Sequence, residues 1–263
     1  MCVLAGMFGL QRICPTRKNR TKPGSSTDRA AFTDRTQAIV LCNPKNPTGT
    51  VHTHAGPEQV AELGRTWDVI AITDEIYEHI SFDGRLHVAL AGLDGRRDRP
   101  VTVGGMSKSY SVTGWRVGTM IAPPALTHAF RQVHDFVSIG AAAPLQEAGA
   151  VAYRLPREYY AALAAGYQAR RDRLCKALIG VGFELDLPQG AYYVMAAIDA
   201  FGAADDVTFA RHLVREVGVA TVPGSSFFVD KALDRRYVHF YFCKCDATLD
   251  DAAGRLRALR VMV

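Results

Sequence analysis

Side chains able to carry carbonyl chemistry follow three short apolar runs in the first half of the chain. Asn46 comes after QAIVLC, Asp74 and Tyr77 come after VIAIT, and Lys108 comes after VTVGG, with Arg116 eight positions further on. A partly desolvated lysine amine has a lowered pKa, and its neutral form attacks carbonyl carbon. A carboxylate stabilises a nearby cation, and the planar guanidinium group of an arginine suits a phosphate.

Together these groups match the demands of pyridoxal phosphate. Its aldehyde needs an amine such as that of Lys108, and its ring nitrogen stays protonated beside a carboxylate such as that of Asp74. Its phenolic oxygen needs donors, which Tyr77 and Asn46 supply, and its phosphate needs Arg116. Each residue alone is more often structural, so the inference depends on their joint occurrence in this order.

The elements that must position these residues alternate between strands and helices. Apolar, strand-like runs cover residues 37–42, 69–73, 101–105 and 117–122, and helical patterns cover 57–65, 127–136 and 144–154. This alternation predicts an α/β fold with a mostly parallel sheet and helices on both faces. Ligands in such folds bind at the carboxyl ends of the strands. We therefore expect loops 43–49, 74–77 and 104–108 to converge.

The pattern becomes shorter and more mixed in the second half. A long helix is predicted over residues 157–179, followed by strand-like runs over 190–198 and 237–242 and helices over 207–217 and 249–259. We predict three parts: an irregular segment (1–36), a partial cofactor-binding large domain (37–155) and a smaller α+β domain (156–263).

Composition favours an ordinary soluble protein. The 263 residues are 48% apolar and 22% charged, with a formal net charge of +5. No apolar run is long enough to cross a membrane, and the basic cluster over residues 12–22 is best interpreted as a solvated tail. We predict a cytoplasmic location, with neither a membrane nor a nucleic acid as partner.

Cysteines and histidines give no clear sign of a metal site. Six cysteines in this length do not predict a disulfide framework. Cys243 and Cys245 form a C-x-C pair, and His52 and His54 an H-x-H pair, but neither has a second pair at ligand spacing. We therefore predict no metal.

Several motifs resemble those of the class I/II aminotransferases, which are fold type I pyridoxal-phosphate enzymes. They are NPKNPTG, TDEIYEHI, SKSYSVTGWRVG and the frame around YVHFYF, and the resemblance runs from about residue 28 to the C-terminus. VHDFVSIGAAAPLQEA is similar to the branch that acts on kynurenine, glutamine or methionine. The resemblance implies the fold type I large domain, here incomplete.

The resemblance also implies roles for the residues in these motifs. Lys108 would be the Schiff-base lysine and proton shuttle, Asp74 would pair with the pyridine nitrogen, and Tyr77 and Asn46 would contact the ring oxygen. Arg116 would bind the phosphate, and Ser107 would join the cofactor-binding set. The implied reaction moves an amino group between an L-amino acid and a 2-oxo acid, at a site that family members build in a homodimer.

Three departures from the family pattern stand out. Only about forty residues precede NPKNPTG, where the family has a longer stretch. Gly105 stands where many members have a phosphate-binding serine, and His239 stands where the family has an arginine for the substrate carboxylate. His239 is either a substrate contact or a core histidine. Arginine gives a permanent two-pronged contact, whereas histidine gives one donor.

Two other functions stay open at this point. A lyase or synthase of the same fold would carry the same motifs, and product analysis would separate it from a transaminase. A catalytically impaired remnant that acts as a binding or partner subunit is favoured by the short N-terminus and by His239.

Overall fold

The computed structural model describes residues 32–93, 100–228 and 234–259. The basic cluster over residues 12–22, and nearly all of the segment predicted to be irregular, lie outside these ranges. Within them, no helix has the length and apolar character needed to cross a lipid bilayer.

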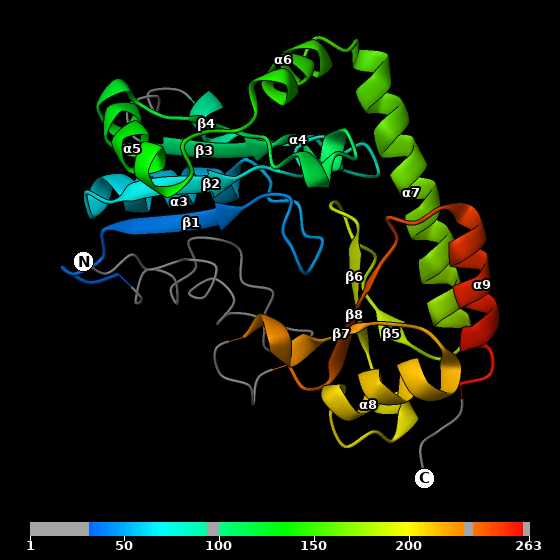
Figure 1. The fold of residues 1–263 in the computed structure, drawn as a ribbon. Coiled ribbons are helices and arrows are strands. Elements are labelled where there is room, and N and C mark those ends of the chain that lie inside the picture. Colours follow the sequence, from blue (N-terminus) through cyan, green and yellow to red (C-terminus); the bar gives the residue numbers. More distant parts are fainter. Residues whose placement is uncertain (1–31, 94–99, 229–233, 260–263) are drawn as a thin grey trace.

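The first sheet contains four strands in the order β1-β2-β3-β4 (Figure 1). Their bounds are β1 Ala38–Cys42, β2 Ile70–Asp74, β3 Pro100–Gly105 and β4 Gly118–Ile121. Strands β1, β2 and β3 are parallel, and β4 pairs antiparallel with β3. The sheet is mixed and mostly parallel, as predicted.

Helix α3 (Ala55–Thr66) joins β1 to β2 and packs against both strands. Val60 and Leu63 are buried in a cluster with Leu41 and Val69, so the spacing of apolar residues along the helix directs one face toward the sheet. Helices α5 (Pro124–Val137) and α6 (Ala143–Ala152) follow β4. In Figure 1, α5 lies in front of the sheet.

The second sheet is antiparallel, with the order β5-β6-β8-β7. Its strands are β5 Glu184–Leu185, β6 Tyr193–Ala197, β7 Val222–Pro223 and β8 Tyr237–Tyr241, and its helices are α7 Arg157–Gly180, α8 Asp206–His212 and α9 Asp246–Leu256. Helices α7 and α9 lie side by side (Figure 1). In the sequence, the strands of the first sheet precede residue 155 and those of the second sheet follow it. The division into three parts stays a prediction.

One core cluster joins the segment after β2 to the second sheet. Tyr77, Ile80 and Phe82, which follow β2, are buried among apolar side chains of the second sheet and of α7. Gly190 lies at this junction, and a Cβ atom there would meet the Ile80 carbonyl oxygen at 2.8 Å and Pro44 Cβ at 2.9 Å. Only glycine permits this close approach without displacement of the backbone.

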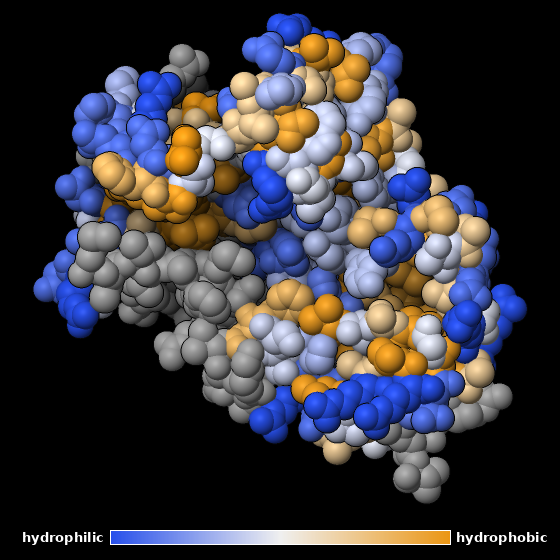
Figure 2. Space-filling view, viewed as in Figure 1, coloured by the Kyte–Doolittle hydropathy of each residue, from blue (hydrophilic) through white to orange (hydrophobic). Residues whose placement is uncertain are grey.

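Apolar side chains remain exposed on the part that holds the first sheet. Phe136 and Ile139 are 93% and 87% exposed, and Met120 and Ile121 of β4 are also exposed. Helix α5 has no buried residue. Figure 2 shows apolar groups gathered on this part of the surface. Contiguous exposed apolar surface typically marks a contact with other protein.

The sequence pattern missed several local features. The α-helix predicted over residues 207–217 ends at His212. Residues Leu213–Val217 then form one wider helical turn, which ends at Gly218, a residue with a positive φ. Strands β5 and β7 have two residues each, too few for alternation to reveal them. The sequence pattern predicts the last helix over residues 249–259, but the helix begins at Asp246 and ends at Leu256.

Candidate active site

The carboxyl ends of β1, β2 and β3 lie in register. Cys42 pairs with Asp74, and Asp74 pairs with Val103. The Asn43 N–H donates to the Asp74 carbonyl at 3.0 Å, and the Glu75 N–H donates to the Val103 carbonyl at 2.8 Å. The expected convergence of the three loops at one sheet edge is therefore confirmed.

Lys108 lies in the short helix α4 (Met106–Ser109), directly after β3. Its side chain is half-buried, and its Nζ atom lies 5.5 Å from the centre of the Tyr192 ring. The Tyr159 hydroxyl donates to the Ser109 carbonyl at 2.7 Å, which ties the end of α4 to α7. The amine is thus held between the first sheet and an aromatic ring of the second part.

Asp74 lies at the end of β2, close enough to Lys108 for their charges to interact. Burial raises the pKa of the Asp74 carboxyl, and the nearby Glu75 charge adds to this; a hydrogen bond from the Ile76 N–H and the charge of Lys108 act in the opposite direction. The Ile76 N–H lies 3.2 Å from Asp74 Oδ1. A further cation beside this carboxylate would stabilise its ionised form.

Arg116 and Ser107 lie on the two sides of one turn. Pairing of β3 with β4 brings the Met106 N–H to the Val117 carbonyl at 3.3 Å, which returns the chain to the start of α4. Thr113 Oγ1 donates to the Ser107 carbonyl at 3.1 Å. The Arg116 side chain is exposed, and its Nη1 donates to the Thr113 carbonyl at 3.2 Å. The predicted phosphate-binding residues therefore share one loop with Lys108.

Asn46 reaches the same region through Cys42. Burial, with the Asp74 charge second, raises the pKa of the Cys42 thiol to about 12, while the nearby Asn46 N–H acts in the opposite direction. Asn46 Oδ1 is buried and has no hydrogen-bond partner among the described residues. A buried polar atom without a partner is costly, and a bound ligand commonly satisfies it.

Tyr77 joins a cluster of aromatic side chains. Its hydroxyl donates to the Tyr193 hydroxyl at 3.1 Å, and its ring meets the Tyr192 ring edge-on at 5.3 Å. Burial, followed by the hydrogen bond to Tyr193, raises the pKa of Tyr77 above its ordinary value, so the phenol stays protonated. Tyr77 can accept a further hydrogen bond there while its own proton is directed to Tyr193.

His239 belongs to the same cluster. Its ring stacks on Tyr193 at 4.5 Å and meets Phe227 edge-on at 4.7 Å. The residue is buried, its Nε2 atom has no partner among the described residues, and burial lowers its pKa to about 4. The structure thus gives a neutral histidine with an unused nitrogen, a state compatible with both interpretations left open by the sequence.

Ile76 occupies the space beside Gly105. A Cβ atom at Gly105 would meet Ile76 Cδ1 at 3.3 Å. That separation is tighter than usual, so a serine in place of Gly105 would require Ile76 to shift. The Ile76 side chain therefore lies in the space that a serine side chain at position 105 would need.

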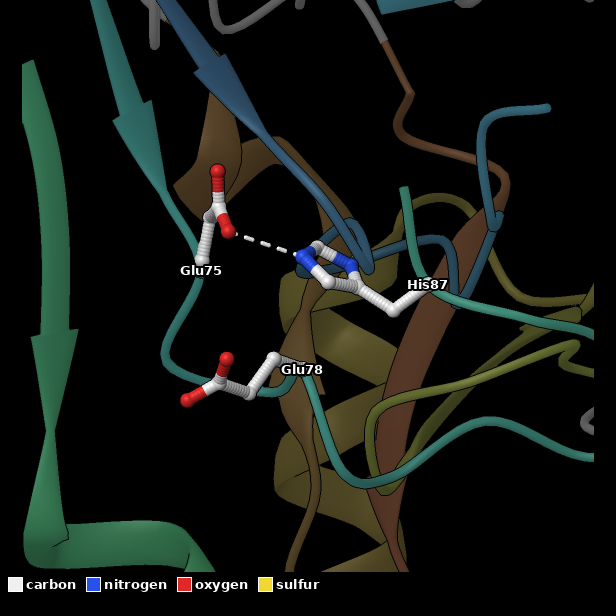
Figure 3. Close-up of side chains that lie close together, drawn as sticks. All are labelled: Glu75, Glu78 and His87. Atoms are coloured by element: carbon white, nitrogen blue, oxygen red, sulfur yellow. Dashed lines mark hydrogen bonds and ion pairs between the residues drawn. The ribbon is translucent and has the colours of Figure 1, made fainter. Parts of the chain in front are cut away.

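Sequence reasoning missed two parts of this region. Tyr192 and Tyr193 stand adjacent in GAYYVM, and only their position in a strand-like run marked them. Glu75, Glu78 and His87 form a second cluster, in which one ligand-type atom from each lies within 4.8 Å of the others (Figure 3). Their spacing matches no metal-ligand motif.

Comparison with known proteins gives the family. The description "Aminotransferase class I and II" matches residues 20–255. The chain belongs to the class I and II aminotransferases.

Individual relatives agree with this assignment. The chain is 35% identical over 253 residues to kynurenine–oxoglutarate transaminase of Dictyostelium discoideum, covering 88% of this chain and 58% of that protein. It is 34% identical over 236 residues to a methionine aminotransferase of Escherichia coli, covering 88% and 59%. The structure of N-succinyldiaminopimelate aminotransferase from Mycobacterium tuberculosis is similar with a TM-score of 0.88 and 35% identity, covering 94% of this chain and 64% of that one. This chain thus spans about 60% of the length of these relatives.

The residues present fit pyridoxal phosphate, which the family uses. The site offers an amine, a half-buried carboxylate close enough to interact with it, and the side-chain amide of Asn46, whose Oδ1 has no partner in the described part of the chain. An aromatic ring lies beside the amine. The amine suits an aldehyde, the carboxylate suits a ring cation, and the Nδ2 group of an asparagine amide can donate to a phenolic oxygen.

Proposed function

We propose that this chain catalyses pyridoxal-phosphate-dependent transfer of an amino group between an L-amino acid and a 2-oxo acid. The observation that carries the proposal is that the Lys108 amine lies beside the Tyr192 ring and is close enough to Asp74 for their charges to interact. When bound, the cofactor supplies an electron sink for charge that develops at the substrate α-carbon.

Lys108 is proposed to hold the cofactor and to move a proton at its Nζ atom. The aromatic ring beside the amine restricts its position, and the proximity of a donor to the reacting atom is a condition for general acid–base catalysis. Asp74 is proposed to stabilise positive charge on the ring, an interaction that a buried carboxylate makes more strongly than an exposed one.

The remaining residues are proposed to orient the cofactor. Asn46 lies on the β1 side of the site and Tyr77 on the β2 side, where they would contact its ring oxygen. Ser107 and Arg116 share the turn beside Lys108, where they would contact its phosphate. His239 is proposed to contact the substrate through its unused Nε2 atom.

An apolar or aromatic amino acid is the proposed substrate class. The relatives include kynurenine–oxoglutarate and methionine aminotransferases. Tyr193, Phe227 and His239 form a largely apolar aromatic surface, which suits such side chains. We also propose a homodimer, supported by the exposed apolar side chains of α5 and β4. The cytoplasmic location stays a prediction from the sequence.

Amino-transfer assays with matched lysine variants test the proposal. Purified protein is loaded with pyridoxal phosphate and given kynurenine, methionine, glutamine or phenylalanine with 2-oxoglutarate, and both products are measured. Lys244 is a matched control because its Nζ atom also lies over a tyrosine ring, at 5.4 Å from the centre of Tyr241, but on the exposed surface. Lys108→Arg should abolish transfer and Lys244→Arg should preserve it. Elimination products without transfer would indicate a lyase instead.

A further inference from the structure

Glu75 is a buried carboxylate directly after Asp74. Its side chain is 4% exposed, and both of its oxygens have partners. Thr73 Oγ1 donates to Oε1 at 2.8 Å, and His87 Nε2 donates to Oε2 at 2.8 Å (Figure 3). A buried carboxylate is tolerated only when such donors satisfy it, so His87 holds Glu75 in one orientation.

The loop that carries His87 is hydrogen-bonded to residues at the ends of both β1 and β2. Next to His87, the Val88 carbonyl accepts a hydrogen bond from Asn43 Nδ2 at 3.4 Å, at the end of β1. Asn43 Oδ1 in turn accepts from the His52 N–H at 2.9 Å. His87 and Val88 therefore connect the end of β2, where Asp74 and Glu75 lie, with the end of β1, which leads into the Asn46 loop.

The neighbouring side chains of Glu75 and Asp74 have different contacts. Thr73 and Glu75 hydrogen-bond to each other, while the intervening residue lies close enough to Lys108 for their charges to interact. Successive side chains at a strand end point to opposite sides. The Thr73–Glu75 bond therefore restrains the backbone on both sides of Asp74.

Glu78 is the third member of the cluster and takes no part in the hydrogen bond between Glu75 and His87. Its carboxylate lies within 4.8 Å of the other two groups, and its Oε1 lies 3.6 Å from His79 Nε2. Because Glu75 Oε2 and His87 Nε2 already bind each other at 2.8 Å, the short contact in the cluster is a hydrogen bond rather than an open ligand set.

We propose that Glu75 and His87 are positioning residues that fix the Asp74 carboxylate toward the cofactor ring. The inference rests on the proposed function, because it assigns a task to Asp74 in cofactor binding. Loss of the His87 donor leaves a buried charge beside Asp74 with one partner fewer, and the β1 and β2 ends lose a shared contact.

Cofactor binding by a set of variants tests this inference. His87→Leu removes the donor, His87→Gln keeps an amide donor, and Glu78→Gln changes the cluster without touching the Glu75 bond. We expect His87→Leu to weaken pyridoxal phosphate binding about tenfold, as losses of outer hydrogen-bond partners do at metal sites. The absorbance band of the bound cofactor should also shift. His87→Gln and Glu78→Gln should stay within about twofold of the parent.

Two further measurements keep the test decisive. Thr73→Val removes the other donor to Glu75 at similar volume, and urea unfolding of each unloaded variant shows whether it folds. Unchanged affinity and absorbance in folded His87→Leu and Thr73→Val would overturn the inference, as would zinc binding by the parent that Glu78→Gln abolishes. If the parent itself forms no borohydride-stable adduct on Lys108, the proposed function fails instead.

Discussion

The Nζ atom of Lys108 lies 5.5 Å from the centre of the Tyr192 ring, a residue 84 positions later in the chain. The lysine belongs to the first sheet's edge, and the tyrosine immediately precedes β6 of the second sheet. The candidate site is therefore formed by both halves of the chain. Its geometry depends on the junction of the two sheets as much as on the local motif around the lysine.

Replacing Tyr192 should weaken the site through loss of its ring. A positive charge that stays at the Lys108 nitrogen when the cofactor is bound would gain about 1 kcal/mol from the aromatic face, so Tyr192→Leu should weaken pyridoxal phosphate binding about fivefold. Tyr192→Phe keeps the ring and should bind the cofactor like the parent. Fluorescence titration with the cofactor measures both. Equal affinity in the leucine and phenylalanine variants would show that the ring contact has no part in binding.

Replacing Asp74 should separate binding from chemistry. Asp74→Asn keeps the shape of the side chain but removes its charge, so a charged ring would lose its main stabilising partner. We expect the transfer rate to fall by about a hundredfold or more, while the adduct on Lys108 still forms. Single-turnover kinetics and mass spectrometry measure the two quantities. A rate close to that of the parent would remove Asp74 from the mechanism.

His239 should make stability fall at mildly acidic pH. Burial lowers its folded pKa from 6.5 to about 4, so the unfolded chain takes up a proton before the folded one does. The stability it contributes is present above pH 6.5 and is lost as the pH falls toward 4. Between pH 7.5 and pH 5 the loss is about 2 kcal/mol.

Urea unfolding at the two pH values isolates this effect. His239→Phe should lose less stability on acidification than the parent, by about 2 kcal/mol, because it has no group to protonate. His54, which is exposed, provides the control, and His54→Phe should follow the parent. The same pH dependence in all three proteins would mean that His239 is not buried in its neutral form.

Gly190 should be intolerant of a methyl group. A Cβ atom there would lie 2.8 Å from both the Ile80 carbonyl oxygen and Val51 Cγ2, so Gly190→Ala should destabilise the fold by about 1–3 kcal/mol. Gly166 is the matched control, since it lies inside helix α7 with open space around its Cβ position. Gly166→Ala should instead stabilise by about 0.5–1 kcal/mol. A melting temperature for Gly190→Ala equal to or above that of the parent would contradict the close packing at Gly190.

Local sequence patterns were sufficient to predict the first sheet and the loops at its edge. Runs of apolar residues that end in NPKNPTG, DEIY and GGMSK mark buried strands followed by polar turns, and the parallel register then brings Asn46, Asp74 and Lys108 together. The family assignment and the mostly parallel sheet are confirmed.

Long-range contacts account for most of what the sequence did not reveal. Tyr192 and Tyr193 acquire their place only when the second sheet packs against the segment after β2. The Glu75–His87 bond spans a loop whose spacing has no recognised pattern. The buried, unpartnered state of His239 likewise follows from Tyr193 and Phe227 on either side, which alternation along β8 does not specify. The assigned roles of the site residues stay predictions.

Mapping the covalent adduct is the most direct test of the central claim, that Lys108 holds pyridoxal phosphate. The protein is mixed with the cofactor, reduced with borohydride, digested and sequenced by mass spectrometry, alongside Lys108→Arg and Lys244→Arg. We expect one modified peptide carrying Lys108, absent from the first variant and retained in the second. No adduct, or an adduct that survives in Lys108→Arg at the parent's level, would contradict it.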